Sequence, residues 1–181
     1  GSMSDTEQKI QQAIDFHRAD NTAEGLALLD ELIPTLEDAR IALFVRGCLR
    51  VGNEDAQNAI VDWEAALDND LQLAAALHQQ HTALVDKALY DFHFETTVEA
   101  NDANVHSALG RALRLFGRFD EAITSLVRST ELSRSMWRDG VTAVELQLKM
   151  GQVEQALALV TGLLESRQDN GELHYQVGRI Y

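Results

Sequence analysis

Two histidines in the segment HQQH, His78 and His81, have the spacing of a metal-binding pair, because they lie one helical turn apart. A third ligand would have to come from a residue such as His93 or Asp91, and the glutamate of an HExxH motif is missing. A surface or interface position on a helix explains both histidines without a metal. We therefore predict neither a metal site nor a cofactor.

Cys48, the single cysteine of the chain, is the other candidate for covalent chemistry. It follows Gly47 in the middle of a predicted helix, without the strained turn or glycine-rich oxyanion loop that serves a nucleophile. P-loop, GxGxxG, GxSxG and paired CxxC motifs are missing. Carboxylate pairs such as Asp68 and Asp70 fall where helix caps and turns are expected. We predict a packing role for Cys48, no catalytic residues and no enzymatic activity.

The elements that would position these residues are predicted to be helices. Proline occurs once, at Pro34, aromatic and β-branched residues are sparse, and no Asn-Gly hairpin signal occurs. The 181 residues suffice for one domain or one continuous repeat array.

The start of the chain and its hydropathy bear on where the protein is found. Gly1 and Ser2 before Met3 are interpreted as the remnant of a removed tag. The residues after Met3 show neither the basic nor the apolar region of a signal peptide. No stretch approaches the roughly 18 consecutive apolar residues of a membrane span. We expect a cytoplasmic, bacterial protein without membrane contact; the alternative is a periplasmic protein whose signal peptide has been removed.

The net charge of −14 falls entirely in residues 1–102, whereas residues 103–181 carry nine acidic and nine basic residues. Such acidity disfavours nonspecific binding to nucleic acid or anionic membranes. The asymmetry either keeps a helical surface soluble or gives the acidic half a preference for basic partners.

A sequence repeat indicates how the helices are arranged. The segment LGRALRLFGRFDEAITSLVRSTEL, residues 109–132, has a counterpart one repeat period later in GQVEQALALVTGLLES, in which Gly151 replaces Gly117. Apolar residues recur three and four apart on both sides of Gly117, which predicts two amphipathic helices near 104–116 and 120–132. One such pair cannot bury its apolar face alone and must stack on the next pair.

Small residues recur with the same period, at the places where two antiparallel helices would approach most closely. In the unit from residue 103 these are Gly110 and Ala122. A larger side chain there is expected to cost about 1–3 kcal/mol through overpacking. The place of Gly110 is held elsewhere by Ala13, Gly47 and Gly178, and that of Ala122 by Ala59 and Ala156.

This pattern resembles the tetratricopeptide repeat (TPR), a helix-turn-helix unit of about 34 residues. The resemblance implies an all-α fold, a right-handed α-solenoid of antiparallel helix pairs. It is recognisable in four units and poor in residues 74–102, where the small contact residues are missing, and the family's usual proline is missing throughout. After the tag remnant and start Met at 1–3, a single array over 4–181 is predicted, with units near 6–39, 40–73, 74–102 (irregular), 103–136 and 137–170 and a partial unit 171–181.

The resemblance also implies a binding groove, because the first helices of TPR units line a concave face that holds a peptide. Carried over by position, the peptide-binding residues are Arg111, Arg114, Arg138, Arg179, Ser107, Tyr175, Phe44 and His78, with His17, Cys48 and Glu145 beside them. The Lys and Asn clamp of the chaperone-binding members is not found, so binding of a chaperone tail is not predicted.

The arginines determine the expected ligand. Arg111 and Arg114 lie three apart on one helix, so both can point the same way. Several converging arginines would favour an acidic peptide or a C-terminal carboxylate. The alternative is that the arginines are solvated or paired within the chain, as Arg114 or Arg118 with Asp120 would be.

We therefore predict a noncatalytic protein-protein interaction scaffold that binds a peptide or protein segment in its groove. The alternatives are a docking or regulatory region of a larger enzyme, such as a bacterial transferase, and a self-associating assembly module. The last helix, GELHYQVGRIY, brings Val177, Ile180 and Tyr181 close together at the end of the chain. Because arrays normally end on a polar face, this end is interpreted as a cut within a longer protein, with a natural capping helix as the alternative.

Overall fold

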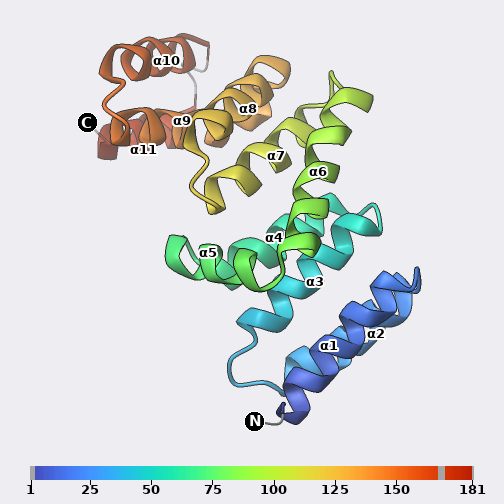
Figure 1. Cartoon of the computed structure of the whole chain (residues 1–181). Coiled ribbons are helices and arrows are strands. Elements are labelled where there is room, and N and C mark those ends of the chain that lie inside the picture. Colours follow the sequence, from blue (N-terminus) through green and yellow to red (C-terminus); the bar gives the residue numbers. More distant parts are fainter. Residues whose placement is uncertain (1–2, 167–169, 181) are drawn as a thin grey trace. The chain divides into compact units, whose positions relative to one another are not determined.

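Every regular element in residues 3–166 and 170–180, the part of the chain that the computed structural model describes, is helical (Figure 1). None of these helices is long and apolar enough to cross a membrane. Gly1 and Ser2, which are interpreted from the sequence as a tag remnant, and Tyr181 lie outside the described residues. The helices are α1 (Asp5–Arg18), α2 (Thr22–Leu32), η1 (Ile33–Thr35), α3 (Arg40–Gly52), α4 (Ala56–Leu67), α5 (Leu71–Gln80), α6 (Thr82–Val98), α7 (Ala103–Leu115), α8 (Phe119–Leu132), η2 (Arg134–Met136), α9 (Trp137–Lys149), α10 (Val153–Ser166) and α11 (Gly171–Ile180).

Four pairs of consecutive helices pack side by side as antiparallel hairpins: α1–α2, α3–α4, α7–α8 and α9–α10. This confirms the predicted all-α fold of antiparallel helix pairs. Three residues join the helices of each pair, and the middle one has a left-handed backbone. These middle residues are Asp20 (φ 64°), Glu54 (φ 59°), Gly117 (φ 74°) and Gly151 (φ 76°). The two glycines break the helices as predicted, and in the first two hairpins Asp and Glu adopt the conformation that glycine favours.

Replacing Gly151 by alanine tests this turn, because an added Cβ would meet no atom within 4 Å and only the backbone conformation opposes it. A left-handed backbone costs a residue with a Cβ about 1–2 kcal/mol. We expect Gly151→Ala to lower the free energy of unfolding by about 1 kcal/mol. Gly162 in α10 has the same open space without a positive φ, so Gly162→Ala should raise it by about 0.5–1 kcal/mol. Urea unfolding curves that shift in the same direction for both variants would contradict the turn assignment.

The two helices of a pair approach each other closely, and this explains why small residues recur at the predicted contact positions. A Cβ on Gly47 of α3 would overlap the Trp63 ring of α4, and one on Gly110 of α7 would lie 2.7 Å from Leu126 Cγ of α8. Gly178 differs, because it is exposed and an added Cβ would meet no atom within 4 Å. Its contact role, which requires a second helix in the partial unit 171–181, stays a prediction. The alanines of the second helices are fully buried, as predicted: Ala59, Ala122 and Ala156.

The irregular segment 74–102 falls in α5 and α6, which are joined by His81 alone. One residue cannot supply the three-residue turn of the other pairs, and the two helices do not lie side by side (Figure 1). Instead α6 packs on the preceding hairpin, where the Phe92 ring lies 5.6 Å from the Trp63 ring of α4. The segment is helical, as expected, but it is not a hairpin.

The helices belong to two compact units, which divide between Phe94 and Glu95 within α6. Unit 1 (Gly1–Phe94) contains α1–α5 and most of α6, and unit 2 (Glu95–Tyr181) contains the end of α6 and α7–α11. The continuity and the right-handed superhelix predicted for the array stay predictions. In unit 2, α9, α10 and α11 share a core that consists of Trp137, Val141, Val144, Ala156, Val160, Leu163, Leu173 and Val177.

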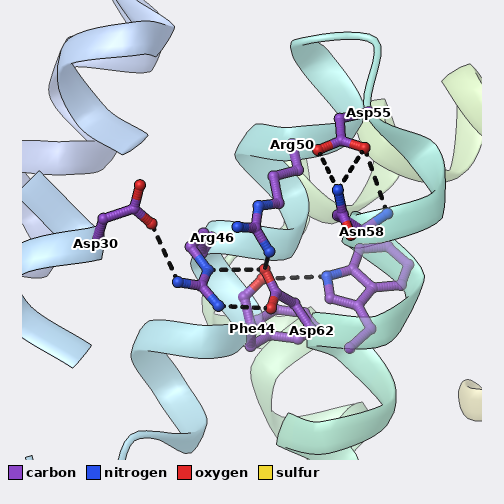
Figure 2. A network of polar contacts seen from close by, with 8 residues as sticks. Asp30, Phe44, Arg46, Arg50, Asp55, Asn58 and Asp62 are labelled. Atoms are coloured by element: carbon purple, nitrogen blue, oxygen red, sulfur yellow. Dashed lines mark hydrogen bonds and ion pairs between the residues drawn. The ribbon is translucent and has the colours of Figure 1, made fainter. Parts of the chain in front are cut away.

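A buried carboxylate on α4 is the centre of a hydrogen-bond network that links α2, α3 and α4 of unit 1 (Figure 2). Asp62 of α4, whose side chain is 4% exposed, accepts hydrogen bonds from Arg46 Nε at 2.9 Å and Nη2 at 2.8 Å. Arg50 Nη1 donates to the same carboxylate at 2.7 Å, and both arginines come from α3. Arg46 Nη1 also donates to Asp30 of α2 at 3.1 Å. The network therefore connects α2, α3 and α4.

Carboxylates also cap helices, as the sequence predicts. Asp70 accepts a hydrogen bond from the backbone N–H of Leu73 at 3.0 Å and begins α5. Asp55 accepts one from the backbone N–H of Asn58 at 3.4 Å and begins α4 (Figure 2). Such bonds satisfy backbone donors that have no partner within the helix.

Candidate functional site

The four arginines predicted to bind a ligand all lie on first helices of unit 2, and we call them the arginine set: Arg111, Arg114, Arg138 and Arg179. Arg111 and Arg114 are half-buried on α7, beside a face that buries Leu109, Ala112 and Leu113. The other two are exposed, on α9 and α11. The set therefore offers positive charge on each first helix of unit 2.

Arg138 has contacts within the chain. Its Nη2 lies 2.8 Å from Glu172 Oε2 of α11, and its guanidinium lies 4.1 Å from the centroid of the Trp137 ring. More than half of each charged side chain is exposed, so the pair contributes little to stability. Arg179 Nη1 is 3.5 Å from Gln176 Oε1 on the same helix. An acidic ligand at Arg138 would have to compete with Glu172.

Arg118 forms an ion pair with a different residue from Asp120, the partner suggested from the sequence. Arg118 Nη2 lies 2.7 Å from Glu121 Oε2, one helical turn further along α8. Asp120 Oδ1 lies 3.5 Å from Gln152 Nε2. Arg118 is thus compensated by a near neighbour, as many surface arginines are.

Two of the predicted groove residues belong to the protein interior. Phe44 is 0% exposed because its ring stacks on Trp63, with ring centroids 5.6 Å apart, and its carbonyl accepts a bond from Trp63 Nε1 at 3.1 Å. Ser107 is 6% exposed on the buried side of α7. Their role as ligand contacts stays a prediction, and TPR position alone does not say whether another helix covers a face. Tyr175 on α11, in contrast, is 66% exposed.

His78 belongs to unit 1, whereas the arginine set belongs to unit 2. Its Nε2 is 2.7 Å from Asp86 Oδ1, which joins α5 to α6. Among the described residues, His, Cys, Asp and Glu side chains do not gather in the groups of three that a metal ion would need. His81 is half-buried between the two helices, and burial lowers its pKa.

A pocket of about 200 Å³ in unit 1 was not expected from the sequence. Its walls come from α1, α2, α3, α6 and the α1–α2 turn. The residues that line it are His17, Asp20, Thr22, Cys48, Gly52, Leu84, Lys87, Ala88 and Asp91. His17 and Cys48 had been assigned to the groove, and the signal that could have revealed the pocket is the apolar face of α6 in an otherwise irregular segment.

Cys48 is inert in this setting. Burial raises the pKa of its thiol to about 12, so the thiolate that a nucleophile needs does not form near neutral pH. The predicted packing role agrees with its 2% exposure.

His17 makes the stability of unit 1 depend on pH. Burial, assisted by the positive charges of Lys87 and Arg18, lowers the pKa of the ring from 6.5, and Asp20 and Asp91 oppose that shift. The fold therefore favours neutral His17, and this contribution is lost as the pH falls below 6.5 through the lower pKa of the folded state. We expect the free energy of unfolding of unit 1, followed by Trp63 fluorescence in a Trp137→Phe background, to fall between about pH 7 and pH 5. His17→Gln should flatten this dependence, and an unchanged slope would refute the role of His17.

Comparisons with known proteins found one curated relative and several similar solved structures. No family model matches the chain. The chain is 24% identical over 172 residues to Superkiller complex protein 3 of Mus musculus, covering 91% of this chain and 10% of that protein. It therefore spans about a tenth of the length of the curated relative that it matches.

Solved structures similar to this chain include two TPR proteins. One is a thermophilic TPR protein of Thermus thermophilus, at 18% identity and a TM-score of 0.45, with 97% of this chain and 98% of that one covered. The other is YrrB, a TPR protein with an unusual peptide-binding site, at 19% identity and a TM-score of 0.44, with 94% and 90% covered. The chain is similar to TPR proteins. The assignment of a TPR-like fold depends on the four hairpins of this chain. These hairpins share the same three-residue turn and the same kind of close contact between their two helices.

Proposed function

We propose that the protein is a noncatalytic interaction scaffold whose first helices in unit 2 bind an acidic peptide or protein segment. The observation that supports this most is a difference in side-chain polarity between units 1 and 2 at equivalent repeat positions. In α3 the positions predicted to face the groove hold Phe44 and Cys48, both buried. The same positions in α7 hold Ser107 and Arg111, and Arg114 follows one turn later. Unit 2 thus carries guanidinium groups where unit 1 carries apolar side chains.

The chemistry of these groups determines the class of ligand. An arginine guanidinium is always charged and presents several N–H donors in a plane, which matches a carboxylate. Tyr175 adds an exposed aromatic ring on α11, and such rings provide contact area with little loss of side-chain entropy. Residues 103–181 carry no net charge, so the preference for an acidic ligand would be local to the arginine set.

Reversing two charges of the set tests the proposal. Arg111→Glu combined with Arg114→Glu should abolish retention of an acidic partner in a pull-down from native lysate read by mass spectrometry, while the melting temperature changes by no more than about 2 °C. The matched control is Arg128→Glu with Arg134→Glu, which makes the same charge change at exposed positions of α8 and η2.

The outcomes separate the proposal from its alternatives. An acidic protein that is retained by the wild type and by the control, but lost by the double variant, supports binding at Arg111 and Arg114. Equal retention by all three proteins would remove these arginines from the site. The docking region of a larger enzyme and the self-associating module remain the alternative proposals.

A further inference from the structure

The groove-facing positions of unit 1 are closed to solvent. In both of its regular hairpins the first helix places three side chains, at spacings of four and three, on the face that holds a peptide in TPR proteins. All of them are buried or half-buried in this structure. They are Ile10, Ile14 and His17 on α1 and, one repeat period later, Phe44, Cys48 and Val51 on α3.

The helix that lies against this face is α6. The pocket of about 200 Å³ has His17, Cys48 and Gly52 on one side and Leu84, Ala88 and two charged residues of α6 on the other. Further along α6 the Phe92 ring reaches the Trp63 ring, which is itself stacked on Phe44. Figure 1 shows the first part of α6, in green, against the teal hairpin α3–α4.

The apolar side chains of α6 match this position. One face of the helix is buried, whereas the other exposes aromatic as well as charged side chains. The exposed side carries Tyr90 and Phe94, whose exposed fractions are 61% and 51%. The buried side consists of Leu84, Val85, Ala88, Leu89 and Phe92.

The attachment of α6 differs from that of the hairpin helices. His81 alone connects it to α5, and the two do not pack side by side. The interface with α1 and α3 contains the pocket, whose walls include the charged pair Lys87–Asp91 and the half-buried His17. A polar pocket within an interface reduces the apolar contact between its two sides, and weakly packed interfaces are among the first places where a fold opens.

We infer that α6 is a detachable cover of the groove of unit 1: it occupies this face as the helix of a binding partner would, and it leaves while α1–α4 stay folded. As long as α6 is in place, unit 1 offers no groove to a peptide. A partner that binds there must carry an amphipathic helix of the same pattern and replace α6. This inference is independent of the ligand proposed for the arginine set.

Cys48 provides the test, because it is the single cysteine and lies beneath α6. In the closed state its thiol is buried and its pKa is raised, so a thiol reagent can modify it only after an opening. The experiment measures the rate at which Ellman's reagent modifies Cys48 in the full chain under native conditions. Two variants, each of which removes one buried methyl group from a helix, are compared with the wild type: Ala88→Gly in α6 and Ala59→Gly in α4.

If α6 opens alone, Ala88→Gly weakens only the cover and should raise the modification rate about fivefold or more, while Ala59→Gly changes it less than about twofold. Equal acceleration by both variants would show that Cys48 is reached only when the whole unit unfolds, and would overturn the inference. No acceleration by either variant would show that the reagent reaches Cys48 without moving α6, which contradicts it as well.

Discussion

Replacing Asp62 by alanine should lower the free energy of unfolding of unit 1 by about 3 kcal/mol. The carboxylate is 4% exposed and accepts three hydrogen bonds, two from Arg46 and one from Arg50. Its removal leaves two guanidinium groups at 17% and 23% side-chain exposure without their main counterion. Breaking a buried ion pair from one side costs more than the pair contributes, because the remaining charges stay desolvated.

Asp30 supplies the matched control, because it bonds the same Arg46 from the exposed end of the network. It accepts a single bond of 3.1 Å, and its side chain is 56% exposed. Asp30→Ala should therefore cost less than about 1 kcal/mol. The two variants are compared by urea unfolding followed through Trp63. Losses of similar size would refute the assignment of Asp62 as the centre of the network.

Trp63→Ala should have the largest effect of any single core substitution in unit 1, about 3–5 kcal/mol. The ring is 0% exposed, stacks on Phe44, tilts against Phe92 and donates a hydrogen bond to the Phe44 carbonyl. Truncation would open a cavity where α3, α4 and α6 meet and remove the hydrogen bond that the indole donates to that carbonyl. Circular dichroism during thermal unfolding measures the loss.

Tyr90→Ala is the appropriate comparison for Trp63→Ala. Tyr90 is an aromatic residue of unit 1 that is 61% exposed and stacks on Phe94, with ring centroids 6.1 Å apart. Its truncation should cost less than about 1 kcal/mol. If the tryptophan variant melted no earlier than the tyrosine variant, Trp63 would not hold the three helices together.

The hairpins can be predicted from the sequence because the residues that form their turns and helix contacts recur with the repeat period. The repeat period, the glycines at 117 and 151 and the buried alanines all report contacts between neighbours in sequence, and such contacts reappear in every pair. The same turn in the first two hairpins was hidden by Asp20 and Glu54, which adopt a glycine-like backbone with ordinary side chains. Their spacing, which equals the repeat period, was the signal that could have revealed it.

Contacts outside the repeat escape this kind of prediction. Phe44 and Cys48 occupy positions that face a groove in TPR proteins, but α6 comes from an irregular segment, and no period indicates where it packs. The Asp62 network is likewise confined to unit 1, because the position equivalent to Asp62 holds Ser125 in α8. The repeat positions did place the arginine set on first helices of unit 2, and its role in binding stays a prediction.

The most direct test of peptide binding in unit 2 uses defined ligands. A library of acidic, basic and apolar peptides, with free or amidated C-termini, is screened against the full chain and against the Arg111→Glu, Arg114→Glu variant. We predict that acidic peptides bind the wild type, that binding weakens with salt, and that the double variant loses it. A wild type without preference for acidic peptides, or a double variant that binds them equally well, would contradict the proposed function.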